Sequence, residues 1–103
     1  MDIEYGNSLD PREDELIEAM NAVHDFPGFY PVVLIMRNVE GVRPFVDAAV
    51  AYVQDGDAYT VTEKASSKGT YLSFHLQLWV ADARIALRRK EELRTLDGLM
   101  SIL

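Results

Sequence analysis

The residues best suited to bind a ligand are four consecutive ones, Ser66-Ser67-Lys68-Gly69, which precede a long alternating segment. Two hydroxyl groups, an ammonium group and the backbone N–H groups of a tight turn can converge on an anion. The same residues also suit an ordinary hairpin turn, because Gly69 permits a positive φ, Lys68 keeps the turn solvated and the serines hydrogen-bond locally. The residue types leave both interpretations open, an anion-binding turn and a structural one.

The residue types that most often carry catalysis or bind metals form no recognisable site. His24 ends a predicted helix and His75 lies within a predicted strand, and neither has the neighbours that a metal site or a nucleophile–base–acid triad needs. Cysteine is absent, which excludes disulfides and thiolate chemistry. Glu91-Glu92 and Asp55-Gly56-Asp57 suit solvated helix and turn positions better than acid–base pairs. We therefore expect no enzymatic activity, no cofactor and no metal.

The longest alternating segment runs from residue 71 to residue 80 and predicts a strand. Its apolar face is made by every second residue, namely Leu72, Phe74, Leu76, Leu78 and Val80. The opposite face carries Tyr71, His75 and Trp79. Aromatic residues on an open sheet face stack bases in one class of RNA-binding protein, but the basic aromatic signature of that class is absent. We expect instead a protein interface here, covered by a second copy of the chain or by the N-terminal helix.

The elements around this strand follow from the apolar periodicity. Residues 29–37 predict a strand that is apolar on both faces, residues 58–65 a polar edge strand, and residues 99–103 a short last strand. A helix over about residues 43–54 is expected to bury Phe45, Val46, Ala49, Val50 and Val53. Asp82 can cap a second helix that runs to about residue 96. The order βαββαβ predicts an α+β domain with a ferredoxin-like fold, a four-stranded antiparallel sheet with two helices on one face.

An acidic segment precedes this predicted domain. Residues 1–25 contain eight acidic residues and one basic residue, so the whole net charge of −7 lies there. Asp10 can cap, and Pro11 can begin, an amphipathic helix over about residues 11–24. The predicted division is an acidic extension at residues 1–25 and a ferredoxin-like domain at residues 26–103.

The predicted acidic helix and the predicted last helix, which is basic, carry opposite charges. Exposed ion pairs add little stability, so these charges would orient the helices, within one chain or between two. The charged residues that we expect to face one another are Asp14, Glu15 and Glu18 on one side and Arg84, Arg88 and Arg94 on the other.

Composition narrows the class of protein further. A chain of 103 residues with 49% hydrophobic content suits one domain. No segment resembles a signal peptide, and no apolar run approaches the roughly 20 residues of a membrane span. The acidic balance, with a pI near 4.6, argues against binding nucleic-acid phosphates. We expect a cytoplasmic protein that binds neither membranes nor nucleic acids.

One eight-residue segment resembles a known family. Ser66-Ser67-Lys68-Gly69-Thr70-Tyr71-Leu72-Ser73 is similar to the Ser-Ser-Lys-Gly-x-Tyr-x-Ser signature of the YbeD-like family of small uncharacterised bacterial proteins. Phe26-Pro27 and the ending from Glu91-Glu92-Leu93 to Leu103 also fit, so the similarity covers roughly residues 26–103. The chain departs from that family in its longer acidic helix and in Arg89 and Lys90, where apolar or aromatic residues are expected.

The resemblance implies a ferredoxin-like fold related to ACT regulatory domains and a non-enzymatic role, linked for some members to lipoate metabolism. ACT domains bind small effectors near the loop after the first strand, often at a dimer interface. Here that loop contains Asn38 and Gly41, although a plain turn also needs such a glycine. The expected function is a non-enzymatic regulatory or protein-interaction module. Its expected binding residues are Ser66, Ser67, Lys68, Gly69, Tyr71, Asn38 and Gly41.

The alternative is an ACT-like sensor that binds a small metabolite between two protomers. A homodimer fits either function, and the partner is an unidentified protein or a small metabolite. The sequence identifies neither the partner nor the process.

Overall fold

The alternating segment at the centre of the chain forms strand β3 (Tyr71–Val80), and its predicted apolar face is the buried one. A computed structural model describes residues 11–103. The predicted cap at Asp10 and the first part of the acidic segment therefore lie outside the described residues. The structure is an α+β fold with three helices and a four-stranded antiparallel sheet in that range.

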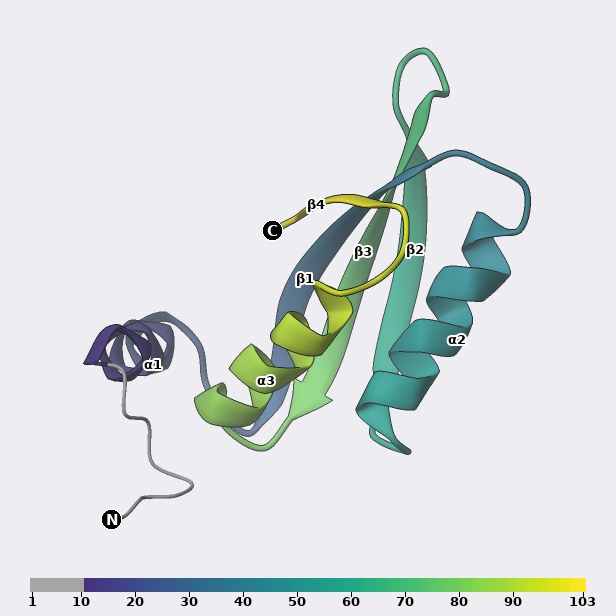
Figure 1. Ribbon diagram of the computed structural model, residues 1–103. Coiled ribbons are helices and arrows are strands. Elements are labelled where there is room, and N and C mark those ends of the chain that lie inside the picture. The colour runs from purple at the N-terminus through teal and green to yellow at the C-terminus, as the bar shows by residue number, and fades with distance from the viewer. Residues whose placement is uncertain (1–10) are drawn as a thin grey trace.

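The sheet is built around β3 and its neighbour β1 (Gly28–Arg37), which pair over their full length from Gly28–Val80 to Arg37–Tyr71. Strand β2 (Tyr59–Ala65) forms one edge and the short β4 (Leu99–Ile102) the other. The strand order is β2-β3-β1-β4, and every neighbouring pair is antiparallel (Figure 1). The polar β2 segment thus lies at an edge, as its sequence predicts.

Helices α2 (Val42–Gln54) and α3 (Ala83–Leu93) cover the same face of the sheet (Figure 1). Asp82 caps α3, because its Oδ1 accepts a 2.9 Å hydrogen bond from the Ile85 N–H. The helix ends at Leu93, three residues earlier than the sequence predicts. Together the helices and the sheet bury an apolar core that contains Phe74, Leu34, Val46, Val50, Ala86 and Leu93.

The buried stripe of α2 differs from the predicted one by part of a turn. Its buried residues are spaced four apart, at Val42, Val46, Val50 and Gln54. Phe45, predicted to be buried, is 43% exposed. This prediction was wrong because residues at i, i+4 and i+8 lie along one row of a helix, and Phe45 stands one position to the side of that row.

The acidic helix forms as α1 (Pro11–Val23) and lies beside α3 at one end of the molecule (Figure 1), where Met20 joins the hydrophobic core. Helix α1 therefore does not cover the open face of the sheet, which corrects one of the two expectations for that face. The chain passes from α1 to β1 through a cis Phe26–Pro27 peptide bond. No helix in residues 11–103 is long and apolar enough to span a membrane.

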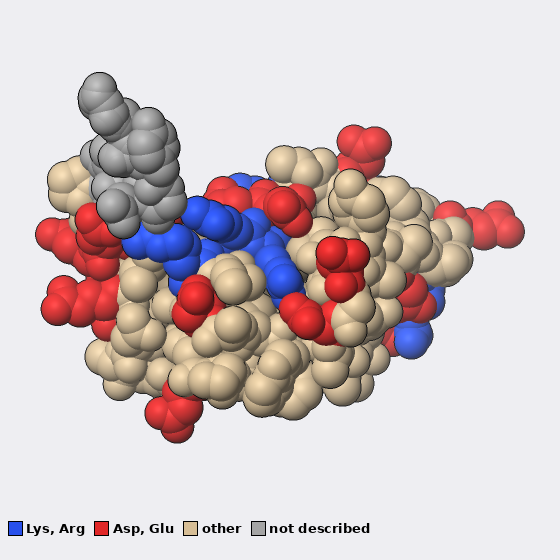
Figure 2. Space-filling model, turned by 90° about the horizontal axis from the view of Figure 1, so that it is seen from below, with Lys and Arg blue, Asp and Glu red and all other residues tan. Residues whose placement is uncertain are grey.

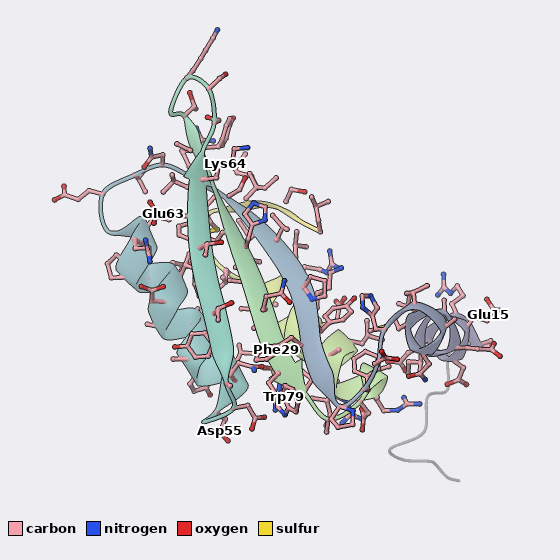
Figure 3. All side chains as sticks on the ribbon, turned by 180° about the vertical axis from the view of Figure 1, so that it is seen from behind. Glu15, Phe29, Asp55, Glu63, Lys64 and Trp79 are labelled. Atoms are coloured by element: carbon pink, nitrogen blue, oxygen red, sulfur yellow. The ribbon has the colours of Figure 1, made fainter. Side chains whose placement is uncertain are left out.

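The charges of α1 and α3 meet in part. Arg84 pairs with Asp14, as expected, at 3.6 Å and also with Glu13 at 3.5 Å. Acidic side chains gather at the α1 end of the molecule, beside a band of basic ones (Figure 2). Glu15 points away from α3 (Figure 3), and Arg94 pairs at 3.2 Å with Glu91 of its own helix. Within one chain the expected pairing therefore does not form for these two residues, because Glu15 lies on the outer side of α1 and Arg94 follows the end of α3. Their pairing between two chains stays a prediction.

Candidate functional site

The open face of the sheet carries a pair of aromatic side chains at one end. Phe29 and Trp79 lie directly opposite each other on β1 and β3, and their ring centroids are 5.1 Å apart in an edge-to-face arrangement (Figure 3). Trp79 is 39% exposed and Phe29 is 48% exposed. Because the two strands pair in register, their odd-numbered residues all share this face, and the aromatic pair begins a longer row.

The rest of the row is apolar in the middle and basic at the far end. Val33 lies opposite His75, Ile35 opposite Ser73, and Arg37 opposite Tyr71. The backbone of Leu103 extends the row next to Val33, with hydrogen bonds of 2.8 and 3.0 Å. The predicted interface residues Tyr71, His75 and Trp79 therefore stand on one face, which no helix of residues 11–103 covers.

The charges of this face are all of one sign. Alternation along β2 adds Thr60, Thr62 and Lys64 to it, and Lys64 lies opposite Ser73. Alternation turns Glu63, the acidic residue of β2, to the helix side, where it pairs with Arg43 of α2. The long strands β1, β2 and β3 thus place Arg37 and Lys64, but no acidic residue, on the open face.

The Ser66–Gly69 segment forms the turn of the β2–β3 hairpin. The Gly69 N–H donates to the Ser66 carbonyl at 2.9 Å, and Gly69 has a φ of +74°. The Ser66 hydroxyl oxygen accepts a 3.1 Å bond from the Tyr71 N–H, and the Ser66 N–H donates to the Tyr71 carbonyl. Ser66, Gly69 and Tyr71 thus have defined roles in the turn, while Ser67 and Lys68 are exposed. Anion binding by this turn stays a prediction.

Asn38 belongs to the same structural unit as this turn. Its side-chain Nδ2 donates a 2.8 Å hydrogen bond to the Gly69 carbonyl, and its backbone N–H donates to the Thr70 carbonyl at 2.9 Å. Two segments that the sequence singles out separately are therefore in contact. Since its amide nitrogen is engaged with the hairpin, Asn38 fixes the loop in place, and the rest of that loop, from Val39 to Gly41, lines a pocket.

The pocket next to Gly41 has a volume of about 430 Å³. Gly41 is the N-cap residue, immediately before α2, and has a φ of +84°, a conformation that suits glycine. The pocket is lined mainly by apolar side chains, among them Met36, Val39, Val42 and Phe45, with Arg37, Glu40 and Asp97 as its charged residues. Next to it on α2, the hydrogen bond from Arg43 to Glu63 raises the pKa of the Arg43 guanidinium.

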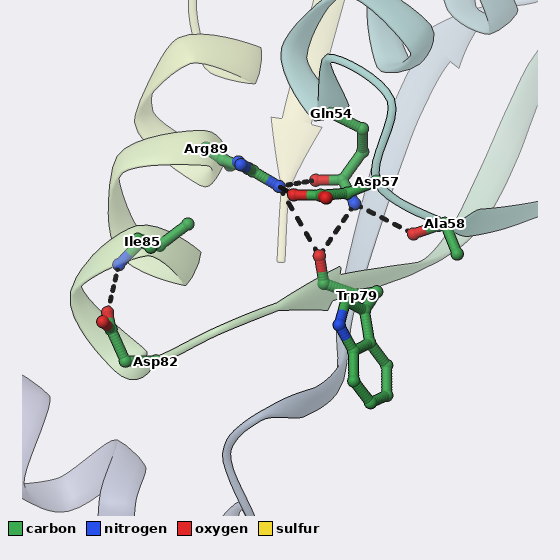
Figure 4. A network of polar contacts seen from close by, with 7 residues as sticks. All are labelled: Gln54, Asp57, Ala58, Trp79, Asp82, Ile85 and Arg89. Carbon is green, nitrogen blue, oxygen red and sulfur yellow. Dashed lines mark hydrogen bonds and ion pairs between the residues drawn. The ribbon is translucent and has the colours of Figure 1, made fainter.

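A network of polar contacts joins α2, β3 and α3, and the sequence reasoning missed it (Figure 4). Gln54 is fully buried, and its Nε2 donates to the carbonyls of Ala58 at 2.9 Å and Trp79 at 3.0 Å. Arg89 Nη1 donates to Gln54 Oε1 at 2.8 Å and to Asp57 Oδ2 at 2.9 Å. These contacts explain why Arg89 occupies a position where the family resemblance leads us to expect an apolar residue. Asp57, predicted to be merely solvated, is an ion-pair partner.

A second cluster surrounds Tyr30 at the start of β1. The Tyr30 ring lies 5.0 Å from the His24 ring and 6.3 Å from the Phe26 ring, measured between centroids. Burial raises the pKa of the Tyr30 phenol. His24 is thus a packing residue in this structure, and residues 11–103 contain no group of three His, Cys, Asp or Glu residues that could hold a metal.

These features define a small α+β domain with an uncovered sheet face and no metal cluster in its described part. The family model for a "Protein of unknown function (DUF493)" matches residues 21–103, and the chain belongs to this family. A UPF0250 protein of Shewanella piezotolerans is 30% identical over 95 residues, which cover 92% of this chain and 99% of the relative. The family predicted from residues 66–73 is thereby confirmed. Neither description names a reaction, a ligand or a process.

Proposed function

We propose that this protein is a non-enzymatic interaction module with a ferredoxin-like fold, and that it binds another protein over the open face of its sheet. The observation that carries the proposal is the uncovered row of Phe29, Trp79, Val33 and Ile35. The strand order β2-β3-β1-β4, with α2 and α3 on one side, supports the fold assignment and leaves that row free.

The composition of the open face supports a protein partner. Contiguous exposed apolar surface marks interaction sites, and tryptophan is among the residues that most often dominate binding energy. Phe29 and Trp79 supply such an anchor, and they stand at the opposite end of the strands from the basic residues Arg37 and Lys64. We expect a partner surface with an apolar centre and an acidic edge, because like charges would be repelled at that end.

The test compares variants of the open face with a matched variant on the other side of the molecule. Trp79→Ala and Ile35→Asp should abolish the association of the full chain with its partner, measured by co-purification and then by titration of the identified protein. Tyr52→Ala is the control, because Tyr52 is an aromatic residue of α2 that is 84% exposed. Association that survives both open-face substitutions would contradict the proposal. Analytical ultracentrifugation of the chain alone shows whether the partner is a second copy.

A metabolite sensor is the second candidate, and the 430 Å³ pocket beside Gly41 is the observation that favours it. Pockets of this size, with apolar walls and a few polar groups, are typical of small-ligand sites. We propose that such a ligand binds in this pocket, in contact with Val39 and Phe45. A thermal-shift screen of amino acids, nucleotides, lipoate and acyl cofactors tests this, since a ligand at 100 times its Kd adds about 2.7 kcal/mol to the free energy of unfolding. Phe45→Ala should abolish the shift, and Tyr52→Ala should retain it.

A further inference from the structure

The outer edge of β2 presents backbone groups that no neighbouring strand satisfies. At one end of β2, the Ala58 carbonyl accepts a 2.9 Å hydrogen bond from the Trp79 N–H. At the other end, the Ser66 N–H donates to the Tyr71 carbonyl at 2.9 Å. Because backbone groups alternate along a strand, the even-numbered residues of β2 face β3 and the odd-numbered ones face outward. No further strand of residues 11–103 lies on that side, so the outward N–H and C=O groups are those of Tyr59, Val61, Glu63 and Ala65.

This edge is regular and accessible. Strand β2 pairs with β3 over all of its residues without a register shift, and it contains neither proline nor glycine. Its residues from Thr62 to Ala65 are exposed. An unblocked edge of this kind can pair with a strand of another chain.

The opposite edge of the sheet is protected from such pairing. Strand β4 has four residues, and its register with β1 shifts between Ile35 and Met36. The part of β1 that β4 leaves free contains Pro31, which has no N–H to donate. Pro31 faces this edge, because the backbone of Val33, two residues later, bonds here to Leu103. Bulges and prolines are common protections of an edge, so β2 is the edge that is open to another strand.

The charges near β2 differ between its two ends. Asp55 precedes the start of the strand, whereas Lys64 lies near its end (Figure 3) and Lys68 in the turn that follows. None of the three forms an ion pair with another residue of 11–103. In an antiparallel pair of identical strands, the start of one lies beside the end of the other. A second copy of β2 would therefore bring an acidic end next to a basic end, twice in the pair.

The charges within β2 select one register for such a pair. Charged residues on an edge strand oppose pairing when like charges lie directly opposite each other. A two-fold axis at Glu63 or at Lys64 would place that residue opposite its own copy. An axis at Thr62 avoids both contacts, because Glu63 then lies opposite Val61 of the second copy and Lys64 lies opposite its Thr60.

The same register uses the whole of β2. It places Tyr59 opposite Ala65 of the second copy, so the two strands overlap in full, whereas an axis one residue earlier shortens the overlap. Residues opposite each other are both odd-numbered or both even-numbered, so the outward N–H and C=O groups of the two strands meet. The carboxylate of Glu63 already pairs with Arg43 of α2, which compensates its charge at this edge.

We infer that the outer edge of β2 pairs with β2 of a second copy of this chain, antiparallel and centred on Thr62, so that two sheets become one. The outward backbone groups of the two edges then hydrogen-bond to each other, and the two-fold contact closes the assembly at a dimer. Both open faces lie on the same side of the joined sheet, because residues opposite each other share a face. The inference concerns the edge of the sheet, so it does not depend on the function proposed for the open face.

Sedimentation equilibrium of the full chain, from micromolar to millimolar concentration, tests the inference with two substitutions at one position. Glu63→Pro removes an outward N–H but no hydrogen bond to β3, and an edge strand tolerates proline at such a position. Glu63→Thr removes the same carboxylate and keeps the N–H. We expect a wild-type dimer whose Kd rises at least tenfold in Glu63→Pro and changes little in Glu63→Thr.

A pair of charge variants tests the register. Thr62→Lys and Thr62→Glu each place like charges opposite one another across the two-fold axis, so each variant alone should raise the Kd of the dimer at least tenfold. An equimolar mixture of the two should form a dimer, because opposite charges then meet. Ser101→Lys, at an exposed position of the other edge strand, is the control and should dimerise like the wild type. Trp79→Ala should also keep the dimer, which separates this edge from the open face.

Three results would overturn the inference. The first is a wild-type chain that stays monomeric at every concentration. The second is a dimer that Glu63→Pro leaves intact, or that Glu63→Pro and Glu63→Thr weaken equally, because neither depends on the outward N–H. The third is a mixture of the two Thr62 variants that stays monomeric. Far-UV circular dichroism confirms that each variant is folded, and if Glu63→Pro is not, the Thr62 variants decide.

Discussion

Arg89 Nη1 donates a 2.8 Å hydrogen bond to Gln54 Oε1, and this contact joins α3 to the last residue of α2. Gln54 is fully buried, so every polar group of its side chain depends on partners within the protein. The Gln54 Nε2 group donates its two hydrogen bonds to the carbonyls of Ala58 and Trp79. Both the oxygen and the nitrogen of the side-chain amide therefore have partners. A buried polar group that loses its partner lowers the free energy of unfolding by about 1–3 kcal/mol. The contact between Arg89 and Gln54 therefore helps to hold α3 and α2 against the sheet.

We expect Gln54→Ala and Arg89→Ala each to lower the free energy of unfolding by about 1–3 kcal/mol, because each leaves buried polar groups unpaired. Urea denaturation measures the change. Arg88→Ala is the matched control, since Arg88 is the exposed neighbour of Arg89 and should change stability by less than about 0.5 kcal/mol. The double variant should lose less free energy of unfolding than the two single variants lose together. The difference, which is the interaction energy of the two residues, should be about 0.5–3 kcal/mol. Strictly additive losses would show that the two residues act independently.

Phe29→Ala should change the fluorescence of Trp79, the one tryptophan of the chain. Removing the ring that lies 5.1 Å away exposes more of the indole to water, so the emission maximum should move to longer wavelength. The lost aromatic contact should also lower stability by about 0.5–1.5 kcal/mol. Phe45→Ala is the control, because Phe45 is a similarly exposed phenylalanine on α2. An unchanged spectrum in Phe29→Ala would contradict the packing of the two rings.

The sequence predicted the sheet well because alternation is a strong local signal. In β3 the large apolar residues occupy every second position, and a shift of one residue would turn all of them to solvent. The positions of the helices could also be predicted, from the helical spacing of their apolar residues and from capping residues such as Asp82. The buried row of α2 could not be predicted in the same way. Phe45 and Val42 are both apolar, and only the packing of α2 on the sheet decides which of them is buried.

The candidate sites were harder to predict from the sequence, because they depend on contacts between residues that are far apart in the sequence. Asn38 and Gly69 are 31 residues apart, and Gln54 and Arg89 are 35 apart. One signal for the second pair was present. Gln54 continues the four-residue spacing of Val42, Val46 and Val50, so a polar residue at a buried position could have been inferred, although its partner could not.

Asn38→Ala should loosen the β2–β3 hairpin, since it removes the 2.8 Å bond to the Gly69 carbonyl. The expected loss is about 0.5–1.5 kcal/mol in the free energy of unfolding, the usual net value of one hydrogen bond. Amide exchange of residues 66–71 should become faster. Lys68→Ala, at an exposed position of the same turn, should change stability by less than about 0.5 kcal/mol. Equal effects of the two substitutions would argue against a structural role for Asn38.

Tyr30 should make the protein less stable at high pH. Burial raises the pKa of its phenol above the ordinary value of about 10, so the unfolded chain loses this proton before the folded one does. The stabilising contribution of the neutral phenol is therefore fully present below pH 10 and is lost as the pH rises through the folded pKa. Tyr30→Phe cannot ionise and should show a shallower fall in stability above pH 10 than the wild type, measured by urea denaturation at stepped pH. Parallel curves for the two proteins would mean that Tyr30 ionises as readily in the folded chain as in the unfolded one.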